Sequence, residues 1–198
     1  ENGDSSLVYM VESFIQKATP NSKFVGFDLE ALHQTLNELA TSEAKILLIG
    51  VSYALLDFCE LHSVSISNLT IMETGGMKGR RAELTRKELH TELKKGFPQS
   101  EIHSEYGMTE LLSQAYSQDG TWFNPPKWMK AVAADISDPF QKRDADGRGL
   151  LAFLDLANYY SCSFIQTRDI GIVNKKGQFS VEGRSDNSDL RGCNLLYT

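Results

Sequence analysis

A chemically rich segment lies at residues Glu101–Glu110 (EIHSEYGMTE). Its first half alternates enough to predict a short strand, a glycine then predicts a turn, and Met108–Leu112 predicts the start of a helix. A strand that passes through a glycine turn into a helix presents backbone N–H groups to a crevice. Tyr106, Thr109 and Glu110 would line this crevice. A ring, a hydroxyl and a carboxylate suit a nucleotide, because they can stack on a base, donate to phosphate and hold Mg²⁺ or ribose.

A pair of glycines lies at the end of a second predicted strand. Gly75 and Gly76 follow the apolar run Leu69–Met72, and their backbone can approach a flat ligand closely because neither residue has a Cβ. A Gly-Gly pair after a strand is more often only a tight turn, so this feature is weak when taken alone. Tyr106 comes one strand–helix unit later, so a base would fit between this backbone and the tyrosine ring.

The elements that carry these residues predict an α/β fold. Continuous apolar runs predict buried strands, and amphipathic spacing predicts helices between them. The predicted helices are Ser5–Lys17, Leu29–Ala40, Ala54–Leu61 and Thr85–Lys95, and the predicted strands are Ala44–Val51, Leu69–Met72 and Glu101–Glu105. This order favours a mostly parallel, Rossmann-like sheet flanked by helices, with ligands beyond the carboxyl ends of its strands.

The last third of the sequence predicts a β-rich subdomain. Short strands are expected at Lys130–Ile136, Leu150–Leu154, Ser163–Gly171 and Gly177–Val181. We therefore expect an α/β subdomain over residues 1–116 and a β-rich subdomain over residues 117–198. The prolines in Thr121–Met129 exclude regular structure there. Asp144–Gly149 is similar to the opening of a calcium loop, but Asp155 stands where such a loop needs glutamate, so a glycine turn is expected instead.

Composition and charge narrow the class of protein. The chain has 198 residues, of which 41% are hydrophobic and 23% charged, as in soluble globular proteins. The net charge of −6 without a basic stripe argues against nucleic acid and against anionic membrane surfaces. No apolar run approaches the roughly 20 residues of a membrane-spanning helix. Three widely spaced cysteines favour a reducing compartment, so we expect a cytoplasmic protein.

The isolated histidines and cysteines are interpreted as structural. His33 lies beside the apolar face of its predicted helix, and no residues at ligand spacing surround it in the sequence. His90 is expected to be exposed on a charged helix. Cys59 is expected to be a small core residue, and Cys162 a structural residue within a strand.

Three ordered motifs resemble those of the adenylate-forming superfamily, which contains acyl-CoA synthetases and luciferase-type ligases. Tyr106-Gly107-x-Thr109-Glu110 is similar to the superfamily's Tyr-Gly-x-Thr-Glu signature, and Gly75-Gly76 to the segment that holds adenine beside it. The segment ending at Asp169 resembles Arg-x-Thr-Gly-Asp, with an arginine in place of the glycine. Arg184 follows Gly183 as in the family's Gly-Arg hinge motif. The resemblance covers roughly residues 73–195.

The resemblance implies ATP and Mg²⁺ as cofactors and gives each of these residues a role. Gly75, Gly76 and Tyr106, with Gly107 in the turn, would frame adenine. Thr109 would orient phosphate, and Glu110 would hold the metal. Asp169 and Arg184 would fix the ribose, since a carboxylate can accept from both hydroxyls of a diol. From spacing alone, Asp169 is better explained as a turn aspartate that closes a hairpin.

The ending Arg191-Gly192-Cys193-Asn194 is similar to that of acyl-protein synthetases of bacterial luminescence. In those enzymes a cysteine near the C-terminus takes the acyl group from the adenylate, so Cys193 would be the acyl carrier. The family's phosphate loop lies upstream of everything in this sequence. We therefore expect the chain to be the C-terminal portion of a longer enzyme, and weakly active or inactive alone.

The resemblance implies a fatty acid or another carboxylic acid as substrate, and an acyl-accepting reductase or carrier as partner. Two alternatives stay open. An acyl- or aryl-CoA ligase similar to phenylacetate-CoA ligase would need a further small C-terminal domain. A non-catalytic acyl- or nucleotide-binding module would bind ATP without using Cys193.

Overall fold

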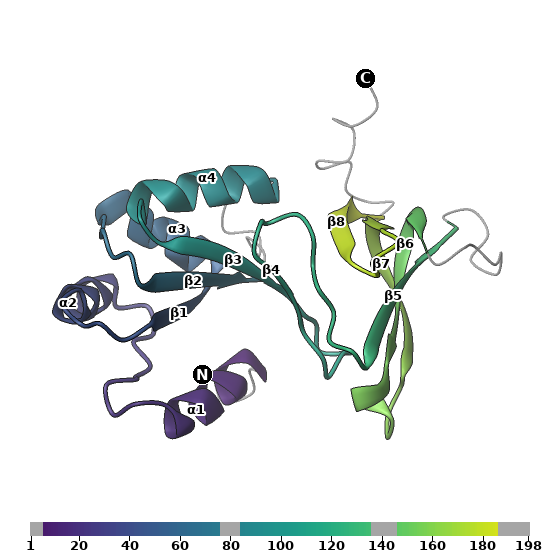
Figure 1. Cartoon of the computed structure of the whole chain (residues 1–198), viewed down its shortest axis with the longest axis horizontal. Coiled ribbons are helices and arrows are strands. Elements are labelled where there is room, and N and C mark those ends of the chain that lie inside the picture. The colour runs from purple at the N-terminus through teal and green to yellow at the C-terminus, as the bar shows by residue number, and fades with distance from the viewer. Residues whose placement is uncertain (1–5, 76–83, 136–145, 186–198) are drawn as a thin grey trace.

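The computed structural model describes residues 6–75, 84–135 and 146–185. In these ranges the chain forms two four-stranded sheets, the first flanked by helices and largely parallel, the second antiparallel (Figure 1). The predicted fold class, an α/β part followed by a β-rich part, is confirmed. None of the described helices is long and apolar enough to cross a membrane.

The first sheet has the strand order β1-β2-β3-β4. Strands β1 (Ile46–Val51), β2 (Leu69–Thr74) and β3 (Glu101–Tyr106) are parallel, as the order of the predicted strands and helices indicates. The short strand β4 (Ala115–Ser117) pairs antiparallel with the second half of β3 and was not predicted. Because β2 and β3 are neighbours and parallel, the loops that leave their carboxyl ends begin at the same edge of the sheet.

Helices α3 (Ser52–Leu61) and α4 (Arg86–Gly96) pack against each other and lie above the first sheet in Figure 1. Helix α2 (Leu29–Leu39) adds its apolar face to the same core, whose fully enclosed members include Phe58, Ile71 and Leu93. Thr85 caps α4 in a capping box with Glu88, as predicted. Helix α1 (Ser6–Lys17) also forms, but none of its described side chains is buried.

The second sheet is an antiparallel meander of β5 (Met129–Ala134), β6 (Gly147–Asp155), β7 (Phe164–Val173) and β8 (Phe179–Arg184). A single 3₁₀ turn, η1 (Leu156–Asn158), follows β6. The apolar residues of this sheet alternate along each strand and meet in a second core that also includes Tyr106, from the end of β3. The two sheets are therefore joined by a shared core as well as by the chain.

Two local predictions are wrong. Residues 107–114 form an irregular loop with a turn from Met108 to Leu111, and not the start of a helix. Two backbone N–H groups of this loop are taken by a buried carboxylate, which removes them from any helical ladder. Cys162 is exposed in the turn before β7, and not inside a strand.

Candidate functional site

The end of β3 meets the second sheet through Tyr106. Its hydroxyl donates to the Oδ2 atom of Asp169 at 2.6 Å, although the two residues are 63 positions apart. The Nε atom of Arg184 lies 3.4 Å from the other oxygen of the same carboxylate. Three of the residues predicted for the nucleotide site are thus brought together by the fold.

The register of the second sheet explains why Asp169 and Arg184 meet. The two residues are directly opposite each other in the antiparallel pair of β7 and β8. The register shifts just beyond them, between Ile170 and Gly171, which marks a β-bulge. The strand that was expected to end near Asp169 continues to Val173, so Asp169 is a strand residue and not a turn aspartate.

The backbone of Asp169 is also held in place. The backbone N–H of Asp169 donates to the Thr167 hydroxyl at 3.0 Å, and that hydroxyl donates to the Leu151 carbonyl oxygen at 2.8 Å. Burial, the Asp169 charge and the hydrogen bond between them raise the pKa of Tyr106 well above its usual range. The phenol therefore stays protonated and serves as a donor to Asp169 at all physiological pH values.

The aromatic ring of Tyr106 does not offer the open stacking face that its place in the sequence suggested. Only 8% of the residue is exposed. Its ring packs against Phe123, Phe153 and Phe179, with centroids 5.1 to 5.7 Å away. In this structure the ring is a core group and the hydroxyl is the polar group that it contributes to the site.

The loop after β3 carries Thr109 and Glu110, both exposed to solvent. The loop is held in place by Asp155, whose side chain is completely buried. Its Oδ2 accepts from the backbone N–H groups of Leu112 and Ser113 at 3.0 and 2.9 Å, and its Oδ1 from the Ser113 hydroxyl at 2.7 Å. The buried side chain of Asp155 thus fixes this loop, and the exposed side chains of Thr109 and Glu110 can face a ligand.

The loop after β2 begins at Gly75, the last described residue before residue 84. Gly75 has a φ of +78°, a left-handed conformation that glycine adopts without strain. It follows Thr74, which pairs in register with Glu105 of β3, so Gly75 and Gly107 leave the same edge of the sheet. Gly76 and Cys193, the two remaining predicted site residues, lie outside the described residues.

Beneath Gly75, a buried polar network surrounds Glu73, which is 1% exposed. Its carboxylate accepts from the Ser52 hydroxyl at 2.8 Å and from Nη1 of Arg86 at 3.0 Å. The Ser52 hydroxyl also lies 3.1 Å from the Gly75 carbonyl oxygen, so the network supports the loop. Burial alone would raise the pKa of Glu73, but His90, the Arg86 charge and the hydroxyl groups of Ser104 and Ser52 lower it.

His90 is part of this network and not an exposed surface residue. Its side chain is 16% exposed, its Nε2 lies 2.8 Å from the Ser104 hydroxyl, and the same atom lies 3.9 Å from Glu73.

Glu105 follows Ser104 in β3, so its side chain lies on the opposite face of the sheet. It accepts from the Thr74 hydroxyl at 3.0 Å. Burial is the largest effect on Glu105 and raises its pKa. Burial, followed by the Glu105 charge and a hydrogen bond to Glu105, raises the pKa of Tyr116 to about 12.

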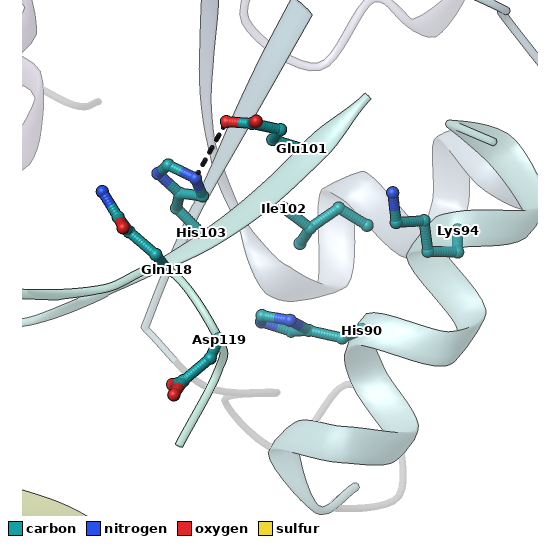
Figure 2. Close-up of a pocket in the computed structure, with 7 residues that line it drawn as sticks. All are labelled: His90, Lys94, Glu101, Ile102, His103, Gln118 and Asp119. Atoms are coloured by element: carbon teal, nitrogen blue, oxygen red, sulfur yellow. Dashed lines mark ion pairs between the residues drawn. The ribbon is translucent and has the colours of Figure 1, made fainter. Parts of the chain in front are cut away.

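An open pocket of about 510 Å³ lies beside the first half of β3, and His90 contributes to its lining (Figure 2). Figure 2 shows that its lining comes from α4, the first half of β3 and the segment after β4: His90, Lys94, Glu101, Ile102, His103, Gln118 and Asp119. None of the predicted site residues lines it. We therefore place the candidate site at the strand ends and not in this pocket.

Sequence reasoning missed several residues that position the site. Thr167 stands at the threonine position of the segment that resembles Arg-x-Thr-Gly-Asp, but no role was predicted for it, and Asp155 was considered only as an unsuitable calcium ligand. Glu73 had one available signal, because it is a carboxylate that continues a buried apolar strand. Such a residue is almost never left unpaired, so partners could have been expected.

The chain matches no family model and no curated protein. It is similar in fold to a mutant form of coronafacic acid ligase from Pectobacterium brasiliense, with a TM-score of 0.58, 18% identity and coverage of 80% of this chain and 32% of that one. ATP-bound MatB from Rhodopseudomonas palustris gives a TM-score of 0.56, 16% identity and coverage of 82% and 34%. For unliganded O-succinylbenzoate coenzyme A synthetase from Bacillus subtilis the TM-score is 0.53 and the identity 18%, with coverage of 79% of this chain and 36% of that one.

The chain therefore spans about a third of the length of these solved structures. At such identities the likeness establishes a shared fold. This chain has the fold of part of these ligases and synthetases.

Asp155 should be the most sensitive acid around the site. We expect Asp155→Asn to lower the free energy of unfolding by about 3 kcal/mol, because its amide would face backbone donors that now meet a buried charge. Asp119→Asn is the matched control, since Asp119 also accepts from two backbone N–H groups, at 2.7 and 2.9 Å, but is exposed. For Asp119→Asn we expect the free energy of unfolding to fall by about 1 kcal/mol. Equal losses in urea denaturation would contradict this ranking.

Glu105 and Glu73 should affect the pH dependence of stability in opposite directions. Glu105 has a raised pKa when folded, so its contribution to stability is full below 4.5, the ordinary value, and declines as pH rises through the raised value. Glu73 has a lowered pKa, so its contribution is full above 4.5 and declines as pH falls further.

Relative to wild type, Glu105→Gln should therefore gain stability as pH rises above 4.5, and Glu73→Gln should gain stability as pH falls below it. Unfolding free energies from urea titrations at a series of pH values measure both slopes. Slopes of the same sign for the two variants would refute the assignment.

Proposed function

We propose that this chain is part of an enzyme that uses ATP and Mg²⁺ to activate a carboxylic acid as an acyl adenylate. One observation carries the proposal: in a fold shared with ATP-dependent ligases, the residues of three separate motifs meet where the parallel strands end. The Tyr106 hydroxyl donates a hydrogen bond to Asp169, and Arg184 forms an ion pair with the same carboxylate. Residues without a common function would have no reason to combine the motif pattern with this geometry.

In this proposal each residue keeps a role suited to its chemistry. Asp169 accepts from the ribose hydroxyls of ATP. Tyr106 and Thr167 are positioning residues, because Tyr106 holds the carboxylate of Asp169 and Thr167 holds its backbone N–H. The exposed Thr109 orients phosphate, and Glu110, also exposed, holds Mg²⁺. The backbone at Gly75 and Gly76 borders the adenine.

The first chemical step forms an acyl–phosphate bond. A carboxylate oxygen of the acid attacks the α-phosphate of ATP, and pyrophosphate leaves with Mg²⁺ neutralising its charge. In the second step the thiolate of Cys193 attacks the carbonyl carbon of the adenylate. AMP leaves, and a thioester remains on the chain. The acyl group, from a fatty acid in our preferred form of the proposal, would then pass to a reductase or carrier partner.

A second candidate is transfer of the acyl group to coenzyme A. It is favoured by the neighbour from Bacillus subtilis, which is itself a coenzyme A synthetase. In that case the first step and the ATP site are unchanged, and Cys193 has no covalent role. The two candidates therefore differ only in the acceptor thiol.

Intact-mass spectrometry of the full-length protein should distinguish the acceptors. After incubation with ATP, Mg²⁺ and a panel of fatty acids, we expect one hydroxylamine-sensitive acyl adduct, absent from the Cys193→Ser variant. Cys162→Ser is the matched control and should keep the adduct, because Cys162 is an exposed thiol without the motif. AMP release without an adduct would favour coenzyme A, and neither product would favour a binding module.

Substitution of Asp169 should affect the KM for ATP more than the KM for the carboxylic acid substrate. We expect Asp169→Asn to raise the KM for ATP about 10–100-fold in ATP–pyrophosphate exchange by the full-length protein, as for loss of charged hydrogen bonds. Glu92, which pairs with Lys95 in α4 and has a side chain that is 44% exposed, provides the control variant Glu92→Gln. An unchanged KM for ATP in Asp169→Asn would remove Asp169 from the proposed site.

A further inference from the structure

A group of metal-type ligands lies on the first half of the chain, away from the proposed ATP site. Glu30 and His33 belong to α2, and His62 caps the C-terminal end of α3. One ligand atom from each side chain can be chosen so that all three lie within 4.8 Å of one another. Within residues 6–75, 84–135 and 146–185, no other three histidine, cysteine or acidic side chains meet this condition.

The fold brings this group together for clear reasons. Residues three apart on a helix share a face, so Glu30 and His33 project side by side from the first half of α2. The adjoining face of α2 carries Leu29, Leu32 and Leu36, which pack into the core that α3 also enters. Burying this apolar face on the core sets α2 beside the end of α3, where His62 emerges.

The measured contacts are close to those of a coordination shell. Nε2 of His62 lies 3.6 Å from Oε2 of Glu30, and the rings of His33 and His62 are stacked with centroids 4.3 Å apart. Ligand atoms at about 2.0–2.1 Å from a tetrahedral Zn²⁺ are about 3.3 Å from one another. Separations of up to 4.8 Å would therefore have to shorten by at most about 1.5 Å, and one ring would have to rotate out of the stack, to complete the geometry.

The surroundings resemble those that support histidine ligands in proteins. Nδ2 of the Asn37 amide lies 3.1 Å from Nε2 of His33. With the amide turned over, its oxygen would accept from Nε2–H, which would leave Nδ1 for a metal and give the ring the outer acceptor that ligating histidines commonly have. Phe58, which is fully buried, contacts both rings and closes the inner side. Glu30 is 66% exposed, so an ion can enter from solvent.

We propose that Glu30, His33 and His62 bind one Zn²⁺ ion, with water at the fourth position. Two imidazole nitrogens and one carboxylate form a donor set that Zn²⁺ prefers, and it is unlike the oxygen-rich set that Mg²⁺ requires. The ion would connect α2 to α3. The site is separate from the proposed function, since it shares no residue with the candidate ATP site.

The test is a titration of the full-length protein, first freed of metal with a chelator, with Zn²⁺ by calorimetry and with Co²⁺ by visible absorption. We expect the wild type to bind one more equivalent than His33→Asn/His62→Asn, and Glu30→Gln to bind this equivalent about tenfold more weakly or worse. His103→Asn is the matched control: His103 also faces a carboxylate, Glu101, at 3.4 Å, but only as a pair (Figure 2).

The expected result is loss of one equivalent in the double variant, weaker binding of that equivalent in Glu30→Gln, and full retention in His103→Asn. Equal stoichiometry in wild type and the double variant would overturn the proposal, as would an equal loss in His103→Asn. Circular dichroism of each metal-free variant checks the fold. Because Glu30 is exposed, Glu30→Gln keeps the test valid if the double variant fails to fold.

ATP–pyrophosphate exchange by the same variants separates this proposal from the proposed function. Loss of the metal equivalent with unchanged exchange would support the site alone. Retained stoichiometry in an active or inactive enzyme would reject the site whatever the outcome for ATP.

Discussion

The position of Tyr106 is the constraint on which the candidate site depends. It is the last residue of a parallel strand of the first sheet, and its ring is buried among phenylalanines of the second sheet. Burying such a ring stabilises a protein by about 1.5–3 kcal/mol, enough to fix the end of β3 against the second sheet. Its hydroxyl then donates to the carboxylate of Asp169. A packing interaction therefore determines where a polar group of the site lies.

The buried carboxylates near the contact between the two sheets are stabilised by different kinds of hydrogen-bond donor. Asp155 is surrounded by backbone and hydroxyl donors, and Glu73 by a guanidinium and a serine hydroxyl. Each has enough donors to keep a charge in a buried position, where an unpaired carboxylate would be very costly. Asp169 is less enclosed, and one of its partners, Arg184, is 67% exposed. Of these acids, Asp169 is the one with hydrogen-bonding capacity that a ligand can reach.

Much of the fold could be predicted because it follows local rules. The apolar runs of β1 and β2, and the capping box of α4, identify those elements without any tertiary contact. The loop after β3 could not be predicted in this way, since its helical pattern is overridden by Asp155, which lies more than forty residues away. The same limit applies to His90, whose buried partner Ser104 belongs to the next strand.

The contact between two of the predicted site residues, Tyr106 and Asp169, agrees with their assignment to one site, but the sequence did not predict its geometry. The sequence placed Tyr106 and Asp169 in one site, but it assigned the ring to a base and the carboxylate to a ribose. In the structure the ring is already packed. Stacking of a base on an aromatic side chain contributes about 1–3 kcal/mol, no more than the burial that the ring would give up.

A nucleotide therefore gains little by drawing the Tyr106 ring out of its core. It gains more from groups that are exposed, or fixed and only partly buried: the backbone at Gly75, the carboxylate of Asp169 and the guanidinium of Arg184. We infer that Tyr106 acts in the proposed site through its hydroxyl, as the group that holds Asp169 in position. On this argument Tyr106→Phe, which keeps the packing and removes the hydrogen bond, should affect the site through Asp169 alone.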